Sequence, residues 1–165
     1  MRISRILATL VVVALGTLWA QTAAQNSAPA KPAEDYSGMY SFLREGEFVQ
    51  LTVEDAGVSG FISRFGDSDS DRGAFLDQFF KQAKLEGNRL EFATEIVHGV
   101  RFEFKGTVER GEGKGPSEEA YHVLRGTLTE FRTDADKKVT VKSREVMFKS
   151  FPQDSESSPP ARKQD

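Results

Sequence analysis

Cysteine is absent from this chain of 165 residues, and its absence excludes several kinds of chemistry. Disulfide cross-links, a thiol nucleophile and a lipid-bearing N-terminal cysteine all need this residue, so stability must come from a hydrophobic core. Only two histidines are present, which leaves zinc without a ligand set. A Gly-x-Ser-x-Gly elbow and a phosphate-binding loop are also missing, so the sequence predicts a protein that is not an enzyme and needs no cofactor.

Clustered basic residues are missing as well. The formal net charge is −3, whereas a surface that follows a phosphate backbone needs grouped lysines and arginines. The sequence therefore predicts no nucleic-acid partner.

The N-terminal segment 1–24 has the layout of a secretory signal peptide. Two arginines come first, an apolar run at 6–20 follows, and small residues precede Gln25. The run is shorter than the roughly 20 residues of a membrane-spanning helix, which favours cleavage over an uncleaved anchor. We therefore expect an exported protein, secreted or periplasmic, with no stable membrane span after processing.

The two flanking segments 25–34 and 152–165 are rich in proline, serine, alanine and charge. Such segments bury too little apolar surface to order themselves, so we expect a disordered linker and a disordered tail. Residues 35–151 remain as one compact domain, a size that a single hydrophobic core can support.

Alternation of apolar and polar residues, the period of strands with one buried face, dominates residues 35–151. Tight turns between short strands produce an antiparallel meander, and closure of the meander removes its exposed edges. Glycines at inward positions, such as Gly106 and Gly126, let the strands of a small barrel bend. The predicted fold is all-β, an antiparallel up-and-down barrel of about eight strands.

The turns test the strand registers. A two-residue turn at 45–46 pairs Tyr40 with Leu51 and brings the apolar residues of both strands to one face. A two-residue turn at 87–88 does the same for the strands on either side of it.

The hairpin that follows needs a longer connection. A three-residue loop at 97–99, with its glycine in the left-handed conformation, pairs Ile96 with Val100 and Phe92 with Phe104. The histidine of this loop is then expected to be an exposed turn residue.

One short helix is predicted between the third and fourth strands, within residues 66–82. At helical spacing, four apolar residues share one side and would plug the end of the barrel. These residues are Phe75, Leu76, Phe79 and Phe80. Acidic residues before the helix would cap it and oppose its dipole.

Asp67, Asp69 and Asp71 stand at alternate positions and raise the alternative of a calcium site. An EF-hand needs glycine at loop position six and a bidentate glutamate at position twelve, where this chain has Arg72 and Gln78. We therefore expect no metal at the three aspartates. A solvated loop also lacks the apolar wall that raises the pKa of a catalytic carboxyl group.

The tripeptide Gly38-Met39-Tyr40 stands on the first strand, and an up-and-down series of short strands follows. This arrangement resembles the calycin-type, lipocalin-like barrels. Lipocalins usually carry tryptophan where Tyr40 stands, and their C-terminal helix has no counterpart in this tail. The resemblance covers the folded part of the chain, implies a fold and carries over no catalytic residue. The chain is also similar to uncharacterised exported bacterial proteins.

Two functions are compatible with these inward-facing aromatic residues. The first is an exported barrel that binds a small apolar ligand, and the alternative is a protein-interaction or inhibitor module with a filled core, acting through its loops. Polar residues inside such a barrel either hold a ligand or satisfy a neighbouring group. The candidate ligand-binding residues are Tyr40, Phe42, Phe92, Thr94, Phe102, Phe104, His122 and Leu124.

Processing of the N-terminus gives the first testable prediction. Because basic, apolar and small residues follow one another in the order of a signal peptide, we expect the exported chain to begin near Gln25. Intact-mass analysis of the exported protein measures this directly. Recovery of the uncleaved chain from a membrane fraction would contradict it.

Overall fold

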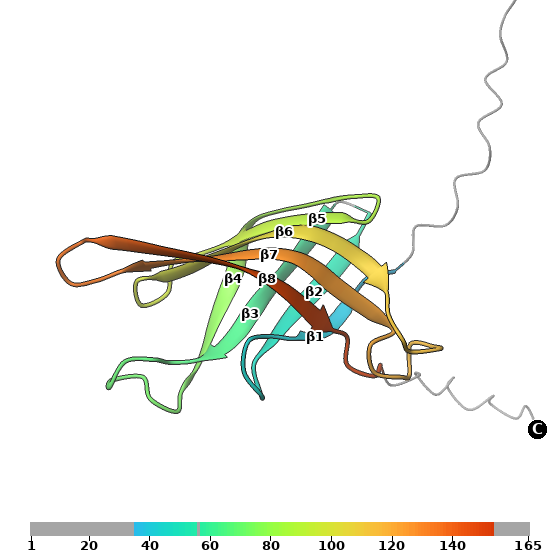
Figure 1. Cartoon of the computed structure of the whole chain (residues 1–165), viewed down its shortest axis with the longest axis horizontal. Coiled ribbons are helices and arrows are strands. Elements are labelled where there is room, and N and C mark those ends of the chain that lie inside the picture. The colour runs from blue at the N-terminus through green and yellow to red at the C-terminus, as the bar shows by residue number, and fades with distance from the viewer. Residues whose placement is uncertain (1–34, 56, 154–165) are drawn as a thin grey trace, which may run out of the picture. The chain divides into compact units, whose positions relative to one another are not determined.

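The computed structural model describes residues 35–55 and 57–153, which form one antiparallel sheet of eight strands (Figure 1). Each strand pairs with the next strand along the chain. The strands are β1 (Gly38–Ser41), β2 (Phe48–Glu54), β3 (Gly57–Phe65), β4 (Phe75–Glu86), β5 (Arg89–Thr94), β6 (Val100–Arg110), β7 (His122–Thr133) and β8 (Val139–Lys149). The predicted signal peptide, the linker and nearly all of the predicted tail lie outside the described residues.

The all-β, up-and-down architecture is confirmed, and it agrees with the calycin-type resemblance. The sheet curls until its edge strands meet at one end, where Tyr40 bridges to Ser150 and the Phe151 amide donates to the Met39 carbonyl at 2.8 Å. β1 has four residues and β8 has eleven. The barrel is therefore closed at this end only, and most of β8 forms a free edge.

The predicted helix is wrong, because its residues form the first half of β4. The apolar residues divide between the two faces of a strand instead of sharing one side of a helix. Phe80 stacks on Phe92 inside the barrel, with ring centroids 4.2 Å apart, whereas Phe79 packs on Phe61 outside it at 5.4 Å. Pairing with both β3 and β5 satisfies the backbone of β4, and this tertiary pairing overrides the local helical pattern. No helix plugs the barrel end in the described part of the chain, so the predicted capping role of the aspartates is also wrong.

The first hairpin differs from the predicted register by two residues. Tyr40 pairs with Val49 instead of Leu51, because the connection is longer than two residues. The Phe42 amide donates to the Glu47 carbonyl at 3.0 Å and closes a loop over residues 43–46. A shift of two residues keeps every side chain on its own face, so the predicted inward set is retained.

The β4–β5 hairpin has the predicted register around the turn at 87–88, with Leu85 opposite Leu90 and Ala83 opposite Phe92. Gly87 has a φ of +62°, as this tight turn requires.

The β5–β6 hairpin also pairs Phe92 with Phe104 as predicted, but its turn is shorter than expected. His98 and Gly99 both have positive φ and form a two-residue turn, so Val97 and not Ile96 lies opposite Val100. The extra residue is accommodated between Thr94, where β5 ends, and Val97.

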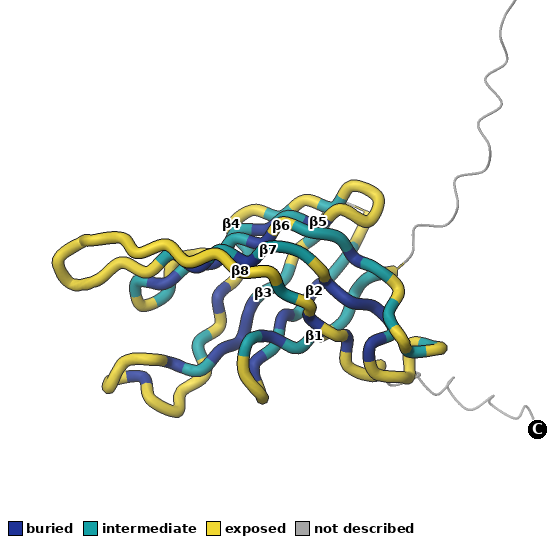
Figure 2. The backbone as a smooth tube through the Cα atoms, in the orientation of Figure 1, coloured by how far each residue is buried: buried dark blue, intermediate teal, exposed yellow. Residues whose placement is uncertain are grey.

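Buried residues lie along the middle of the strands (Figure 2), and the large apolar side chains among them form one core cluster. Their rings form a continuous series of contacts, with centroid distances from 4.2 to 6.3 Å. In order, the series is Phe80, Phe92, Phe104, Phe148, Phe42 and Phe102. By contrast, the tip of the β7–β8 hairpin is exposed. Within the described residues, no helix has the length and apolarity needed to cross a membrane.

The glycine pair Gly106 and Gly126 lies directly opposite on β6 and β7 and allows a close approach of the two strands. A Cβ atom added at Gly126 would lie 2.3 Å from the Lys105 carbonyl oxygen and 2.5 Å from the Gly106 Cα atom. Both neighbours are backbone atoms, so neither can move without disturbing the sheet.

We predict that Gly126→Ala lowers the free energy of unfolding by about 1 to 3 kcal/mol, because the added methyl group overpacks this contact. Urea denaturation of the variant and the wild type measures the difference. Gly115→Ala is the matched control, since a Cβ at Gly115 meets no atom within 4 Å. Equal losses in the two variants would contradict the packing argument.

Candidate functional site

The inward-facing positions change from apolar to charged toward the open end of the barrel. On β3 the inward Ile62 is followed two residues later by Arg64, and on β7 Leu128 is followed by Glu130. Both charged residues are buried, with exposed fractions of 3% and 9%. Because side chains alternate between the two faces of a strand, these charged groups point into the barrel and form its last layer of inward-facing residues, at the open end.

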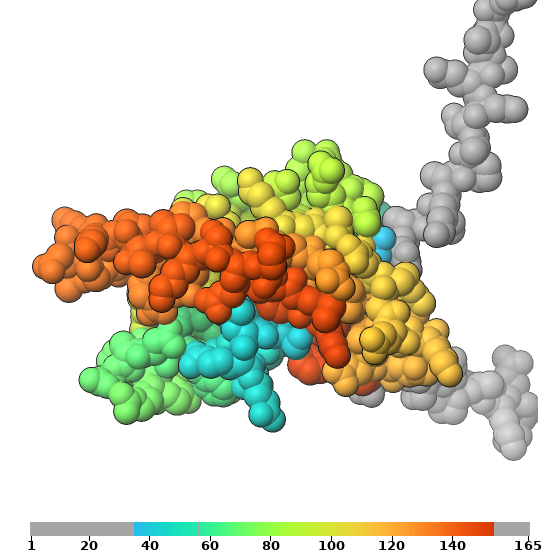
Figure 3. Space-filling model, viewed as in Figure 1, coloured from blue at the N-terminus to red at the C-terminus, as the bar shows by residue number. Residues whose placement is uncertain are grey.

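A hollow of about 450 Å³ occupies this layer. The β7–β8 hairpin, the 66–74 loop and the 43–46 loop lie around this end of the barrel (Figures 1 and 3). Two aromatic rings and a ring of charged side chains line the hollow. The lining residues are Phe42, Leu43, Arg44, Glu47, Arg64, Asp67, Phe102, Glu130, Arg132, Lys142 and Arg144.

Arg64 is the most deeply buried base of the hollow. Its Nε donates to Gln78 Oε1 at 2.6 Å, and its Nη1 donates to the Phe65 carbonyl at 3.1 Å. The nearest carboxylate oxygen, Asp67 Oδ2, lies 3.5 Å from Nη1. Burial lowers the pKa of the Arg64 guanidinium below its ordinary value, since its charged form has lost much of its hydration. A neutral amide is therefore the closest partner of this buried cation.

Gln78 is itself buried and is held in a fixed orientation. Its Nε2 donates to the Val100 carbonyl at 2.8 Å and to the Glu95 carbonyl at 3.2 Å. These bonds turn the amide oxygen toward Arg64 and position the guanidinium.

Asp67 reaches into the hollow from the loop after β3. It accepts from Arg132 Nη2 at 2.8 Å and from Arg44 Nη2 at 3.2 Å, in addition to the longer contact with Arg64. The hydrogen bond from Arg132 lowers the pKa of the Asp67 carboxyl group. One carboxylate is thus shared by three guanidinium groups from three parts of the chain.

Two further carboxylates are paired within the wall of the hollow. Glu47 binds Arg44 at 2.6 Å, and Glu130 binds Arg132 at 2.8 Å and Arg144 at 3.2 Å. Five basic and three acidic side chains line the hollow, which leaves two positive charges in excess. The excess is local, because the chain as a whole has a net charge of −3.

The three alternate aspartates have separate partners. Asp71 Oδ2 accepts a hydrogen bond of 2.6 Å from His98 Nδ1. This bond connects the 66–74 loop to the β5–β6 turn. Asp69 pairs with Arg72 on the exposed side of the loop, and Asp67 faces the hollow. Within residues 35–55 and 57–153, no group of three or more His, Cys, Asp or Glu side chains has a metal-binding arrangement.

The polar residues expected to contact a ligand make contacts within the fold. The Tyr40 hydroxyl donates to the Tyr36 carbonyl at 2.7 Å, and burial raises its pKa. Thr94 Oγ1 accepts from the Phe102 amide at 3.0 Å and donates to the Glu95 carbonyl. His122 is buried, with its ring edge-on to Tyr36.

The apolar candidates all belong to the buried core, and two of them also line the open-end hollow. The two that line the hollow are Phe42 and Phe102, whereas Leu124 lies in the core alone. Phe92 and Phe104 contribute to a second hollow as well as to the core.

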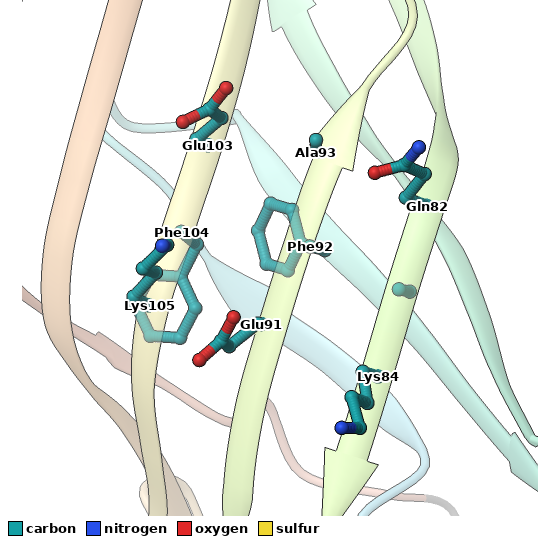
Figure 4. Close-up of a pocket in the computed structure, with 9 residues that line it drawn as sticks. Gln82, Lys84, Glu91, Phe92, Ala93, Glu103, Phe104 and Lys105 are labelled. Carbon is teal, nitrogen blue, oxygen red and sulfur yellow. The ribbon is translucent and has the colours of Figure 1, made fainter.

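This second hollow, of about 360 Å³, lies across β4, β5 and β6 (Figure 4). It adjoins the irregularity in β4 between Phe80 and Gln82. Its charged lining is balanced, with two lysines and two glutamates. The charged lining residues are Lys84, Glu91, Glu103 and Lys105.

Arg64, Glu130 and Arg132 are not among the site residues predicted from the sequence. The signal was present for Arg64 and Glu130, since each continues the inward set of an apolar strand at a distance of two residues. The two-residue alternation shows that Arg64 and Glu130 face the interior of the barrel. It does not show that Asp67 and Arg44, which lie on distant loops, reach the same place.

No family model and no curated protein matches the chain. Among solved structures, the bradavidin2–biotin complex shows a likeness with 11% sequence identity and a TM-score of 0.46. The likeness covers 69% of this chain and 95% of that chain.

The Asp71 contact predicts a specific response to acid. Hydrogen bonds from Ser68, His98 and Ser70 lower the pKa of the Asp71 carboxyl group from 3.8 to about 2. The ionised Asp71 carboxylate therefore stabilises the folded state fully above pH 3.8, and this stabilisation is lost as the pH falls toward about 2. We expect Asp71→Asn to be less stable than the wild type at neutral pH and to lose less stability over this acidic interval. Denaturation series at several pH values measure this.

Asp69→Asn is the control for this experiment, because the Asp69 side chain is on the same loop but is 96% exposed. It should follow the wild type at every pH. If the free energy of unfolding changes with pH in the same way for Asp71→Asn and the wild type, the Asp71 contact does not contribute to stability.

Proposed function

We propose that this protein binds a small molecule in the hollow at the open end of the barrel. The observation that carries the proposal is the composition of the hollow, where two aromatic rings meet several convergent, buried polar groups within about 450 Å³. Ligand sites combine apolar surface with a few fixed polar groups in this way.

The filled core supports this position for the ligand. Phenylalanine rings occupy the middle of the barrel, so an apolar ligand would have to displace packed side chains there. Phe42 and Phe102 stand at the end of this series of packed rings and line the hollow at the open end. The apolar part of the ligand is therefore proposed to lie on these two rings.

A role in binding without catalysis is part of the proposal. The three carboxylates of the hollow, Glu47, Asp67 and Glu130, all accept hydrogen bonds from arginines. The hydrogen bond from Arg132 lowers the pKa of the Asp67 carboxyl group, which makes Asp67 a poor proton acceptor at neutral pH. Export to a secreted or periplasmic location also remains a proposal, supported by the N-terminal segment 1–24.

A second candidate function is an interaction or inhibitor module that acts through its loops. The filled core favours it, since a barrel without a central cavity can serve as a rigid support. Exposed aromatic residues on the outer face favour it too, because Phe75 and Phe79 are more than half exposed beside Phe65 and Phe61.

A neutral fluorescent probe, N-phenyl-1-naphthylamine, tests the proposed ligand site. We expect saturable binding to the protein, and we expect Lys142→Trp to weaken it by about tenfold or more, because the indole fills the hollow. Fluorescence titration measures both. Lys142 lines the open-end hollow and is exposed, so the change has little effect on the core.

Lys105→Trp is the matched control, since it removes the same charge and adds the same ring at the second hollow. It should leave probe binding unchanged. Loss of binding in Lys105→Trp alone would place the ligand on the outer face, and the absence of saturable binding would favour the interaction module.

A further inference from the structure

We infer that the ligand carries an anionic group on an apolar body, and that Asp67 occupies the position of this anion when no ligand is bound. The anion, a carboxylate, sulfonate or phosphate, would bind between Arg64, Arg132 and Arg44. This inference rests on the proposed function, because it concerns the same hollow and names the class of ligand that the hollow takes.

The charge of the hollow is the first argument. Its two excess positive charges lie on an otherwise acidic chain, within a concave space that is partly shielded from water. Like charges concentrated in such a space repel one another, and an anion relieves this repulsion. A neutral ligand would leave the repulsion in place.

The incomplete pairing of Arg64 is the second argument. A buried guanidinium is expected to have a close carboxylate partner, since leaving water is costly for a charge. Arg64 has a neutral amide at 2.6 Å and a carboxylate only at 3.5 Å. The hydrogen bonds of its side chain come from Nε and Nη1, so Nη2 has no hydrogen-bond partner among the described residues. The guanidinium can therefore donate to an incoming anion, and arginine suits carboxylate, sulfonate and phosphate geometry.

The contacts of Asp67 are the third argument. Its carboxylate is supplied by a loop and not by a strand, and it lies where guanidinium groups from three separate elements converge. A side-chain carboxylate in such a place has the chemistry of the proposed anion. Asp67 is 35% exposed, so it can leave the hollow without breaking the hydrogen bonds of the sheet.

The two aromatic residues that line the hollow, Phe42 and Phe102, indicate the chemistry of the rest of the ligand. The Arg64 guanidinium carbon lies 6.0 Å from the centroid of the Phe102 ring, and Phe42 packs edge-on against Phe102 at 5.3 Å. An anionic group held by Arg64 thus places the atoms attached to it over apolar surface. The structure favours an amphipathic anion over a free inorganic one.

Two probes with one skeleton test this inference. The sulfonated probe 8-anilinonaphthalene-1-sulfonate differs from N-phenyl-1-naphthylamine by its sulfonate group alone. We expect the wild-type protein to bind the sulfonated probe about tenfold more tightly than the neutral one at low salt. Fluorescence titrations of both probes measure this ratio.

Removal of the Asp67 carboxylate should strengthen the binding of an anionic ligand but not of a neutral one. We expect Asp67→Asn to tighten binding of the sulfonated probe about fivefold or more and to leave the neutral probe unchanged. Asp69→Asn changes the net charge by the same amount on the same loop, away from the hollow, and should change neither probe. Equal effects of the two variants would overturn the displacement of Asp67.

Arginine variants test the anion-binding groups themselves. Arg64→Met should abolish the preference for the sulfonated probe, and Arg132→Gln, at a more exposed position, should reduce it even if Arg64→Met does not fold. Thermal denaturation establishes which variants are folded.

The outcomes separate this inference from the proposed function. If both probes bind equally and both are blocked by Lys142→Trp, the hollow binds ligands but the anionic class is wrong. If neither probe responds to Lys142→Trp, the proposed function itself fails.

Discussion

The continuous pairing of β6, β7 and β8 is the constraint on which the rest of the structure depends. The β6–β7 ladder and the β7–β8 ladder each run for eleven residue pairs without a shift. Because side chains alternate between the faces of a strand, this register determines every inward position on three strands at once. It buries Leu124 and Leu128 in the core, and by the same rule it directs Glu130 into the barrel.

The charged layer at the open end follows from that constraint. Glu130 cannot turn outward without reversing the faces of β7, so its charge must be compensated where it lies. Arg132 and Arg144 provide this compensation from the same strand and from β8. Networks of this kind contribute little net stability compared with apolar packing, because removing charges from water is costly. Their presence at the open end, beside open space, supports the proposed binding site.

The interior of the barrel has two parts, a packed core in the middle and a hollow at the open end. Stacked and tilted phenylalanine rings fill the middle, and backbone pairing between β1 and the end of β8 closes one end. The packed rings stabilise a chain that has no cysteine. The free edge of β8 and the surrounding loops leave the other end open. The expectation of either a ligand cavity or a filled barrel was too simple, since this barrel is filled in its middle and hollow at one end.

The sequence alone determined the fold class, the succession of strands and the inward face of most of them. These properties follow from local rules, namely two-residue alternation and tight-turn chemistry, as the hairpin at 87–88 illustrates. The sequence alone did not determine the state of residues 75–82, because paired phenylalanines suit both a helix and a strand with two apolar faces. Pairing with β3 and β5 decided it. Nor could local pattern show that Arg44, Arg64, Asp67 and Arg132 meet, since they come from different loops and strands. Only the curl of the whole sheet brings Asp67 within 2.8 Å of Arg132, 65 residues farther along the chain.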